Sequence, residues 1–188
     1  MDYKKIEEEH VMNAETYVPL MQKTAFVNYV AERCFDRVEI RVSADDDVRT
    51  PPYFKDSPER KARYMMGALL KLYLKAGFEP VEGDEWLMSA DDYDRWAGGH
   101  IFNQIERMKG NAKTRDRAFD LLADFRMLEK MLNTEVYSML QVMNDPVTRF
   151  MRILEMQATP DALAAQLSEL KEARRAFDEA FQQRKDGA

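Results

Sequence analysis

The chain concentrates acidic side chains in one short stretch, where the residue types could support chemistry. The stretch from Glu79 to Gly99 reads EPVEGDEWLMSADDYDRWAGG, and no Lys or Arg lies among its carboxylates. The seven carboxylates are Glu79, Glu82, Asp84, Glu85, Asp91, Asp92 and Asp94. Carboxylates gathered in this way could hold a metal ion, act as catalytic acids or attract a basic partner.

The spacing of the carboxylates does not favour a metal site. A calcium-binding loop needs oxygen ligands at fixed positions, with a central glycine and a terminal glutamate. Neither DDYDRWAGG nor SADDDVRT has that spacing. Ser89, followed by Asp91 and Asp92, is typical of a helix start, where first-turn carboxylates each contribute about 0.3–1 kcal/mol. We therefore predict no metal and no cofactor.

The remaining reactive residue types also lack catalytic spacing. Glu7 and His10 have the Glu-x-x-His spacing of di-iron bundles, which need a second such motif, and His100 follows Ala97 at that spacing instead. Both histidines are interpreted as surface or capping residues. Cys34, the single cysteine, has no histidine near it in sequence, so we interpret it as a small buried hydrophobic residue. Without a phosphate loop, nucleophile elbow or zinc motif, the sequence predicts a protein that is not an enzyme.

A docking surface for a basic partner remains as the functional interpretation of the acidic stretch. A helix from Ser89 would place Asp91 and Asp94 side by side, because helical residues three apart are neighbours. The two tryptophans of the chain flank this helix, and tryptophans often anchor interfaces. The predicted partner-binding residues are Glu82, Asp84, Glu85, Trp86, Asp91, Asp92, Asp94 and Trp96. The alternative is that the tryptophans belong to the core and the charges form a solvated face.

A basic stretch follows the acidic one. Between residues 106 and 117, five cations oppose two carboxylates, which gives +3. The cations are Arg107, Lys109, Lys113, Arg115 and Arg117. They could make weak nucleic-acid contacts through phosphates, but no aromatic residue is interleaved with them, so a solvated connector is the alternative.

Helices must position these residues, because apolar side chains recur mostly at steps of three or four. In one helix Ser57 is the expected N-cap, Pro58 the first position and Gly77 the stop. Its expected buried face is Ala62, Met65, Met66, Leu69, Leu72, Tyr73 and Ala76. An earlier helix starts near Pro19. The alternating run 38–42 has no obvious strand partner, so we predict an extended loop.

The second half of the sequence predicts one long helix over residues 115–144, about 45 Å in length. A short helix begins at Asp145-Pro146 and runs through Met156, and a last one begins at Thr159-Pro160. The last helix carries a narrow, coiled-coil-like stripe for oligomerisation, namely Leu163, Leu167, Leu170, Phe177 and Phe181.

These helices predict an all-α fold, an irregular helical bundle with a long central helix and a coiled-coil-like C-terminal helix. Residues 1–156 are the expected helical domain. Residues 157–188 are expected to pack on it or on a second subunit, and we predict a homodimer.

Composition supports a soluble protein. The 188 residues are 45% hydrophobic, carry a net charge of −6, and include thirteen methionines, which suit either core filling or an adaptable contact surface. One cysteine fits a reducing compartment. The N-terminus lacks the apolar run of a signal peptide, and no stretch approaches the roughly 20 apolar residues of a membrane span. The prediction is a cytoplasmic protein without membrane contact.

Three segments also carry a resemblance: TPPYFKDSPERKARYMMGALLKLYL, EWLMSADDYDRWAGGHIFNQIERMKGN and LNTEVYSMLQVMNDPVTR. Together they resemble small helical proteins of phages and prophages of gut Firmicutes. The resemblance implies either a counter-defence protein, such as a type II anti-CRISPR that binds Cas9 with its guide RNA in the host cytoplasm, or a virion assembly factor, tail-associated structural protein or chaperone. An acidic surface fits the positively charged channels of Cas9-type effectors, which favours the first role.

Overall fold

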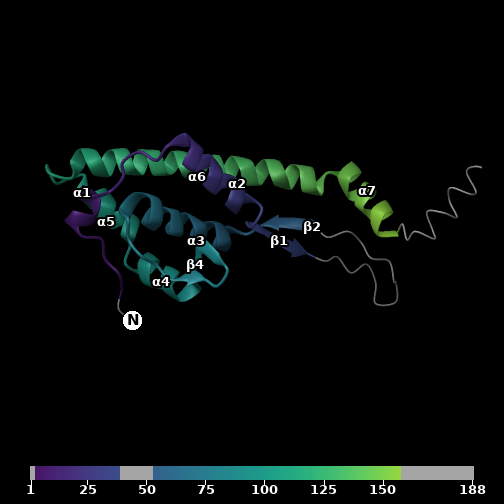
Figure 1. The fold of residues 1–188 in the computed structure, drawn as a ribbon, viewed down its shortest axis with the longest axis horizontal. Coiled ribbons are helices and arrows are strands. Elements are labelled where there is room, and N and C mark those ends of the chain that lie inside the picture. Colours follow the sequence, from purple (N-terminus) through teal and green to yellow (C-terminus); the bar gives the residue numbers. More distant parts are fainter. Residues whose placement is uncertain (1–2, 39–52, 158–188) are drawn as a thin grey trace, which may run out of the picture. The chain divides into compact units, whose positions relative to one another are not determined.

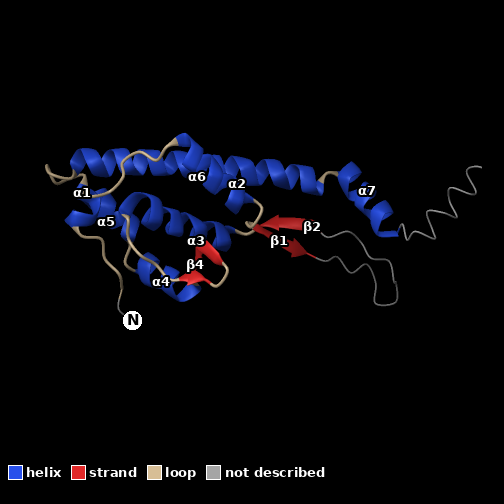
Figure 2. Cartoon of the chain, viewed as in Figure 1, coloured by secondary structure: helices blue, strands red, loops and turns tan. Residues whose placement is uncertain are grey.

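The computed structural model describes residues 3–38 and 53–157 of the chain (Figure 1). The described part is mostly helical, with two small two-stranded sheets (Figure 2), so the all-α prediction is wrong in that detail. The chain forms two compact units, Met1–Val38 with Phe54–Val142 and Glu39–Tyr53 with Met143–Ala188. The predicted C-terminal helix, after residue 157, lies outside the described residues, as does its stripe.

The first helices follow local sequence rules. Helix α1 spans Glu8–Met12, and the imidazole Nδ1 of His10 accepts a hydrogen bond from the Glu7 backbone N–H at 3.2 Å, which confirms the capping interpretation. Helix α2 spans Leu20–Ala31 and begins directly after Pro19, as predicted. No helix among the described residues is long and apolar enough to cross a membrane.

Helix α3, Pro58–Ala68, begins as predicted, with Pro58 at its first position after Ser57. It continues into a π-helix, η1, over Leu69–Leu74. The predicted stop at Gly77 is wrong, because Lys75 adopts a left-handed conformation with φ 52° and ends the helix two residues earlier. The expected buried face is confirmed for Met65, Met66, Leu69 and Tyr73, whereas Ala62, Leu72 and Ala76 are half-buried.

The two sheets were not predicted. Strand β1, Phe35–Val38, pairs with β2, Tyr53–Asp56, so Val38 has a strand partner after all. Residues 39–42 of the predicted loop lie outside the described residues. Strand β3, Pro80–Val81, and strand β4, Asp84–Met88, form an antiparallel hairpin that turns at Gly83, where φ is 80°. The hairpin therefore occupies the first half of the acidic stretch.

The second half of the acidic stretch forms helix α4, Ala90–Gly98. Its predicted start is confirmed, since the hydroxyl of Ser89 accepts a hydrogen bond from the Asp92 backbone N–H at 3.2 Å. Gly99 ends it, and helix α5, Ile101–Met108, follows from His100, whose φ is 54°.

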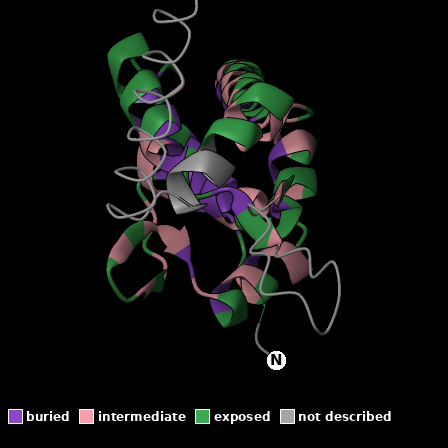
Figure 3. Ribbon diagram, turned by 90° about the vertical axis from the view of Figure 1, so that its right-hand side faces the viewer, coloured by how far each residue is buried: buried purple, intermediate pink, exposed green. Residues whose placement is uncertain are grey.

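Helix α6, Arg115–Asn144, matches the predicted long helix. Its buried positions are Ala118, Leu121, Leu122, Phe125, Leu128, Leu132 and Val136. They pack in the core of the first unit, whose buried segments are purple in Figure 3. In this core the ring of Tyr73 meets Phe125 edge-on at 5.7 Å between centroids. Helix α7, Pro146–Gln157, begins after Asp145, whose carboxylate accepts a hydrogen bond from the Thr148 N–H at 2.9 Å.

Candidate functional site

The acidic stretch is held tightly against the body of the first unit. Strand β4 packs on α3, and the ring of Trp86 meets Phe26 of α2 at 5.2 Å between centroids. Gly67 of α3 permits this approach, because a Cβ there would collide with the carbonyl oxygen of Trp86. Trp86 is half-buried as a residue.

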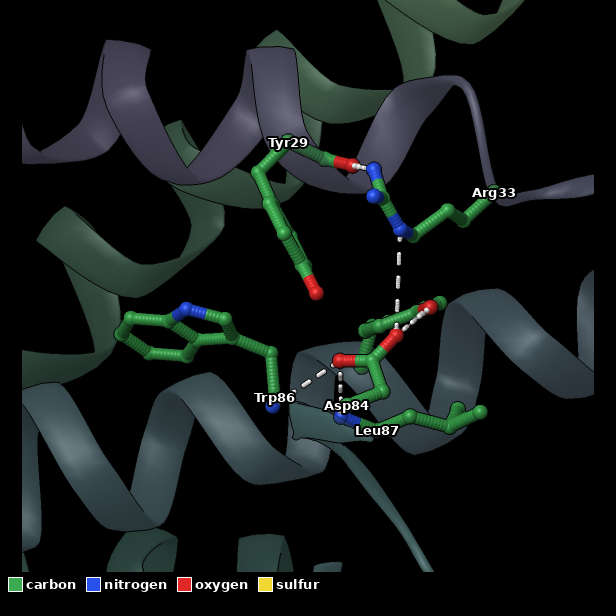
Figure 4. Close-up of polar contacts among 6 residues, drawn as sticks. Tyr29, Arg33, Asp84, Trp86 and Leu87 are labelled. Atoms are coloured by element: carbon green, nitrogen blue, oxygen red, sulfur yellow. Dashed lines mark hydrogen bonds and ion pairs between the residues drawn. The ribbon is translucent and has the colours of Figure 1, made fainter. Parts of the chain in front are cut away.

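The side chain of Asp84 forms hydrogen bonds within its own hairpin (Figure 4). One carboxylate oxygen accepts hydrogen bonds from the backbone N–H groups of Trp86 and Leu87, at 3.1 and 3.2 Å. The other accepts from the Tyr64 hydroxyl at 2.5 Å and lies 3.9 Å from Arg33 Nε. Burial and the hydrogen bond to Asp84 both raise the pKa of Tyr64. With its side chain only 14% exposed, Asp84 is a structural carboxylate, which does not fit its predicted place on the docking face.

Asp92 and Trp96 are also placed differently from the prediction. The Asp92 side chain is 1% exposed, and Trp96 is buried. One Asp92 oxygen lies 2.6 Å from Lys4 Nζ, and the other accepts the backbone N–H of Glu79 at 2.9 Å. Lys4 Nζ also lies 5.2 Å from the Trp96 ring centroid. The carboxylate points inward because it binds the N-terminal segment, a contact that no local sequence pattern reveals.

The N-terminal segment also explains the paired glycines that follow Trp96. The backbone N–H of Lys4 donates to the Arg95 carbonyl at 3.2 Å, so the segment runs along α4. A Cβ at Gly98 would meet the ring of Tyr3, and one at Gly99 would meet the Lys4 carbonyl oxygen. These glycines therefore make room for the N-terminal segment besides ending the helix.

We expect Asp92→Asn to lower the free energy of unfolding by about 1–3 kcal/mol at pH 7, because a buried charged hydrogen bond is lost. Burial alone would raise the pKa of Asp92, but hydrogen bonds from Lys4 and Glu79 and the nearby cations outweigh it and lower the pKa below 3.8. A lowered pKa in the folded state stabilises the fold above pH 3.8 and stops doing so as the pH falls through the folded value.

The difference between wild type and Asp92→Asn should accordingly shrink below about pH 4 in urea titrations. Asp94→Asn is the matched control, because Asp94 is exposed on the same helix. Equal stability of wild type and Asp92→Asn at pH 7 would contradict the buried ion pair.

Four carboxylates of the stretch remain exposed and lack an ion-pair partner among the described residues: Glu79, Glu82, Asp91 and Asp94. Glu85 is 71% exposed but pairs with Lys71 at 2.6 Å, and Lys71 Nζ lies 4.2 Å from the Trp86 ring centroid. Arg95 is the single Lys or Arg of residues 79–98. Its Nη1 lies 4.0 Å from Oδ1 of Asp92. The hairpin and α4 thus present four uncompensated negative charges.

Three of the five cations in the basic stretch bind other residues of the first unit. Lys109 pairs with Glu106 at 2.7 Å, and Arg117 donates to the carbonyl oxygens of Val11 and Ala14 at 3.4 and 2.7 Å. These contacts do not fit the predicted phosphate-binding role of Lys109 and Arg117. A third member of the set, Arg115, is exposed and donates from Nε to the carbonyl oxygen of Lys109 at 3.3 Å. Arg107 and Lys113 are exposed as well.

A polar cluster that the sequence did not reveal lies between α2, η1 and α6. Lys23, which is 1% exposed, forms an ion pair with Asp124. Asp124 also accepts hydrogen bonds from the Tyr73 hydroxyl and the Val18 backbone N–H, both at 3.0 Å. Burial and the neighbouring carboxylate raise the pKa of Tyr73. Because every contact joins distant residues, no motif could have identified this cluster.

Cys34 is fully buried, and burial raises the pKa of its thiol to about 12. The interpretation of this residue as a small hydrophobic side chain is confirmed. No group of three or more His, Cys, Asp or Glu within residues 3–38 and 53–157 is arranged to hold a metal ion.

A groove of about 650 Å³ lies between α3, α5 and α6. Its apolar and aromatic lining is Pro58, Ala62, Met65, Met66, Tyr93 of α4, Phe102, Leu122, Phe125 and Leu132. Polar residues border it, chiefly Lys61, Glu106, Arg126, Glu129 and Asn133. The apolar pattern of each helix was visible in the sequence, but the groove depends on how three helices pack.

Comparisons of the chain with protein-family models, curated proteins and solved structures found no match.

Proposed function

We propose that this chain is an acidic binding protein that docks on a basic surface of its partner. The observation that carries the proposal is the set of four exposed, uncompensated carboxylates Glu79, Glu82, Asp91 and Asp94. Strand β4, whose length is about 15 Å, separates Glu82 from Asp91, so the charges extend along the hairpin and onto α4. Half-buried Trp86 lies on the same hairpin and offers apolar contact area.

The partner we propose is Cas9 with its guide RNA, which would make the chain a phage counter-defence protein acting in the host cytoplasm. Cas9-type effectors hold nucleic acid in positively charged channels. A rigid hairpin with several carboxylates could occupy part of such a channel in place of phosphates. The resemblance to phage proteins supports this choice of partner.

The test is the triple charge reversal Glu82→Lys, Asp91→Lys and Asp94→Lys. Surface charge acts mainly on encounter, so we expect the association rate with purified Cas9–guide RNA complex to fall about tenfold or more at low salt. The dependence of that rate on ionic strength should also flatten. Biosensor kinetics over a series of salt concentrations measures both quantities.

A control with the same change in net charge reverses Glu9, Glu32 and Asp120, which are exposed elsewhere in the first unit. The association rate of the control should stay within about twofold of the wild-type rate, because the change in net charge alone has a weak effect. Identical kinetics of the two triple variants would refute the acidic docking surface. Absence of wild-type binding to the complex would reject Cas9 as the partner.

A role in virion assembly is the second candidate, favoured by large apolar side chains exposed on the first unit. They include Tyr17, Leu20, Met21, Phe119 and Met127, with exposed fractions from 51% to 85%. Exposed apolar area of this kind often marks a lasting protein–protein contact. Detection of the chain in stoichiometric amounts in purified phage particles by mass spectrometry would support assembly over inhibition.

A further inference from the structure

The groove between α3, α5 and α6 is an apolar surface that the acidic docking role does not use. Its floor is formed by Met65 and Met66 of α3 and by Leu122, Phe125 and Leu132 of α6. At one side Phe102 of α5 is 39% exposed and lies against Phe125 at 5.6 Å between ring centroids. Such a floor between helices suits the apolar face of another helix.

The charged residues bordering the groove have ion-pair partners except at one position. Lys61 pairs with Asp56 at 2.6 Å, and Arg126 pairs with Glu106 at 2.9 Å. Glu129 is exposed and has no ion-pair partner among the described residues. An occupant should therefore combine an apolar stripe with a cation beside it.

A segment near the C-terminal end of the sequence has both features. Residues 161–181 lie outside the described residues, and their sequence has Leu163, Leu167 and Leu170 at helical spacing. Lys171 follows Leu167 by four residues, and Arg174 follows Leu170 by four, so helical spacing would put cations next to the stripe.

The lengths of the two surfaces are also comparable. As a helix, the stripe from 163 to 177 would span about 21 Å, and the α6 floor from 122 to 132 spans about 15 Å. We propose that the groove of one copy binds the 161–181 segment of a second copy of this chain. Each copy then offers one groove and one segment, which a two-fold symmetric dimer satisfies reciprocally.

Light scattering at micromolar concentration is the first test. The wild type should have a mass near twice 22.0 kDa. Phe102→Glu should convert it to the monomer mass, because a carboxylate would enter the apolar groove. Leu167→Glu with Leu170→Glu should do the same, and each variant should weaken self-association by at least tenfold. Val142→Glu is the matched control, since Val142 is exposed on α6 and does not line the groove.

A mixing experiment distinguishes loss of the contact from loss of folding. The Phe102→Glu variant keeps an intact segment, and the Leu167→Glu/Leu170→Glu variant keeps an intact groove. Mixed in equal amounts, they can form one complete groove–segment contact, so dimers should reappear. A monomeric wild type, a dimer unaffected by Phe102→Glu, or a mixture that stays monomeric would overturn the proposal. Binding of Cas9 is measured separately, because the acidic carboxylates do not line the groove.

Discussion

Asp124→Ala is expected to lower the free energy of unfolding by about 3–5 kcal/mol, which is a large part of the stability of a typical domain. The substitution removes the carboxylate that compensates buried Lys23. It also leaves the Tyr73 hydroxyl and the Val18 N–H without their acceptor. The cost comes mainly from the uncompensated ammonium group, because a charge held out of water needs a partner.

The double variant Lys23→Met/Asp124→Leu tests this explanation. Replacing both charges with apolar side chains of similar size should cost less than Asp124→Ala alone, since no charge stays buried. Asp120→Ala is the control for the helix, because Asp120 is exposed one turn earlier on α6. Urea unfolding of the variants measures the differences. A double variant as unstable as Asp124→Ala would show that packing, rather than the buried charge, sets the cost.

The Lys23–Asp124 pair marks the limit of what the sequence could predict, because its members are 101 residues apart. Several helix boundaries set by near neighbours were predicted well. The ends of α6, the Ser89 cap and the restart at Pro146 depend on caps, prolines and apolar spacing within a few residues. Strands β1 and β2 were missed because they are four residues each and pair across a long sequence gap. The β3–β4 hairpin is local, but β3 has two residues, too few to show an alternating pattern.

The acidic stretch shows the same limit at the level of single residues. Asp91, Asp92 and Asp94 look equivalent in sequence, yet only Asp92 is buried, because Lys4 and Glu79 lie where its side chain points. Glu82 and Asp84 likewise differ, since the turn at Gly83 directs Asp84 toward Tyr64. Sequence therefore predicted an acidic segment but not which of its carboxylates are exposed.

Gly67→Ala is expected to destabilise the protein although alanine normally favours a helix interior. Within α3, replacing glycine with alanine alone should add about 1 kcal/mol of stability. At Gly67, however, the new methyl group would collide with the carbonyl oxygen of Trp86 and lie 3.1 Å from the Phe78 ring. A carbonyl in a strand cannot rotate away as a side chain can, so β4 must shift, and overpacking of this kind costs about 1–3 kcal/mol.

Gly77→Ala is the matched control, because nothing lies within 4 Å of a Cβ at that position. Each kcal/mol should change the melting temperature by about 2–4 °C in a chain of this size, so thermal unfolding separates the two variants. A shifted β4 would also displace Trp86 and Glu82 relative to α4. Gly67→Ala should therefore slow association with the basic partner even below its melting temperature, whereas Gly77→Ala should not. A Gly67→Ala protein that melts at or above the wild-type temperature would contradict the close packing of β4 on α3.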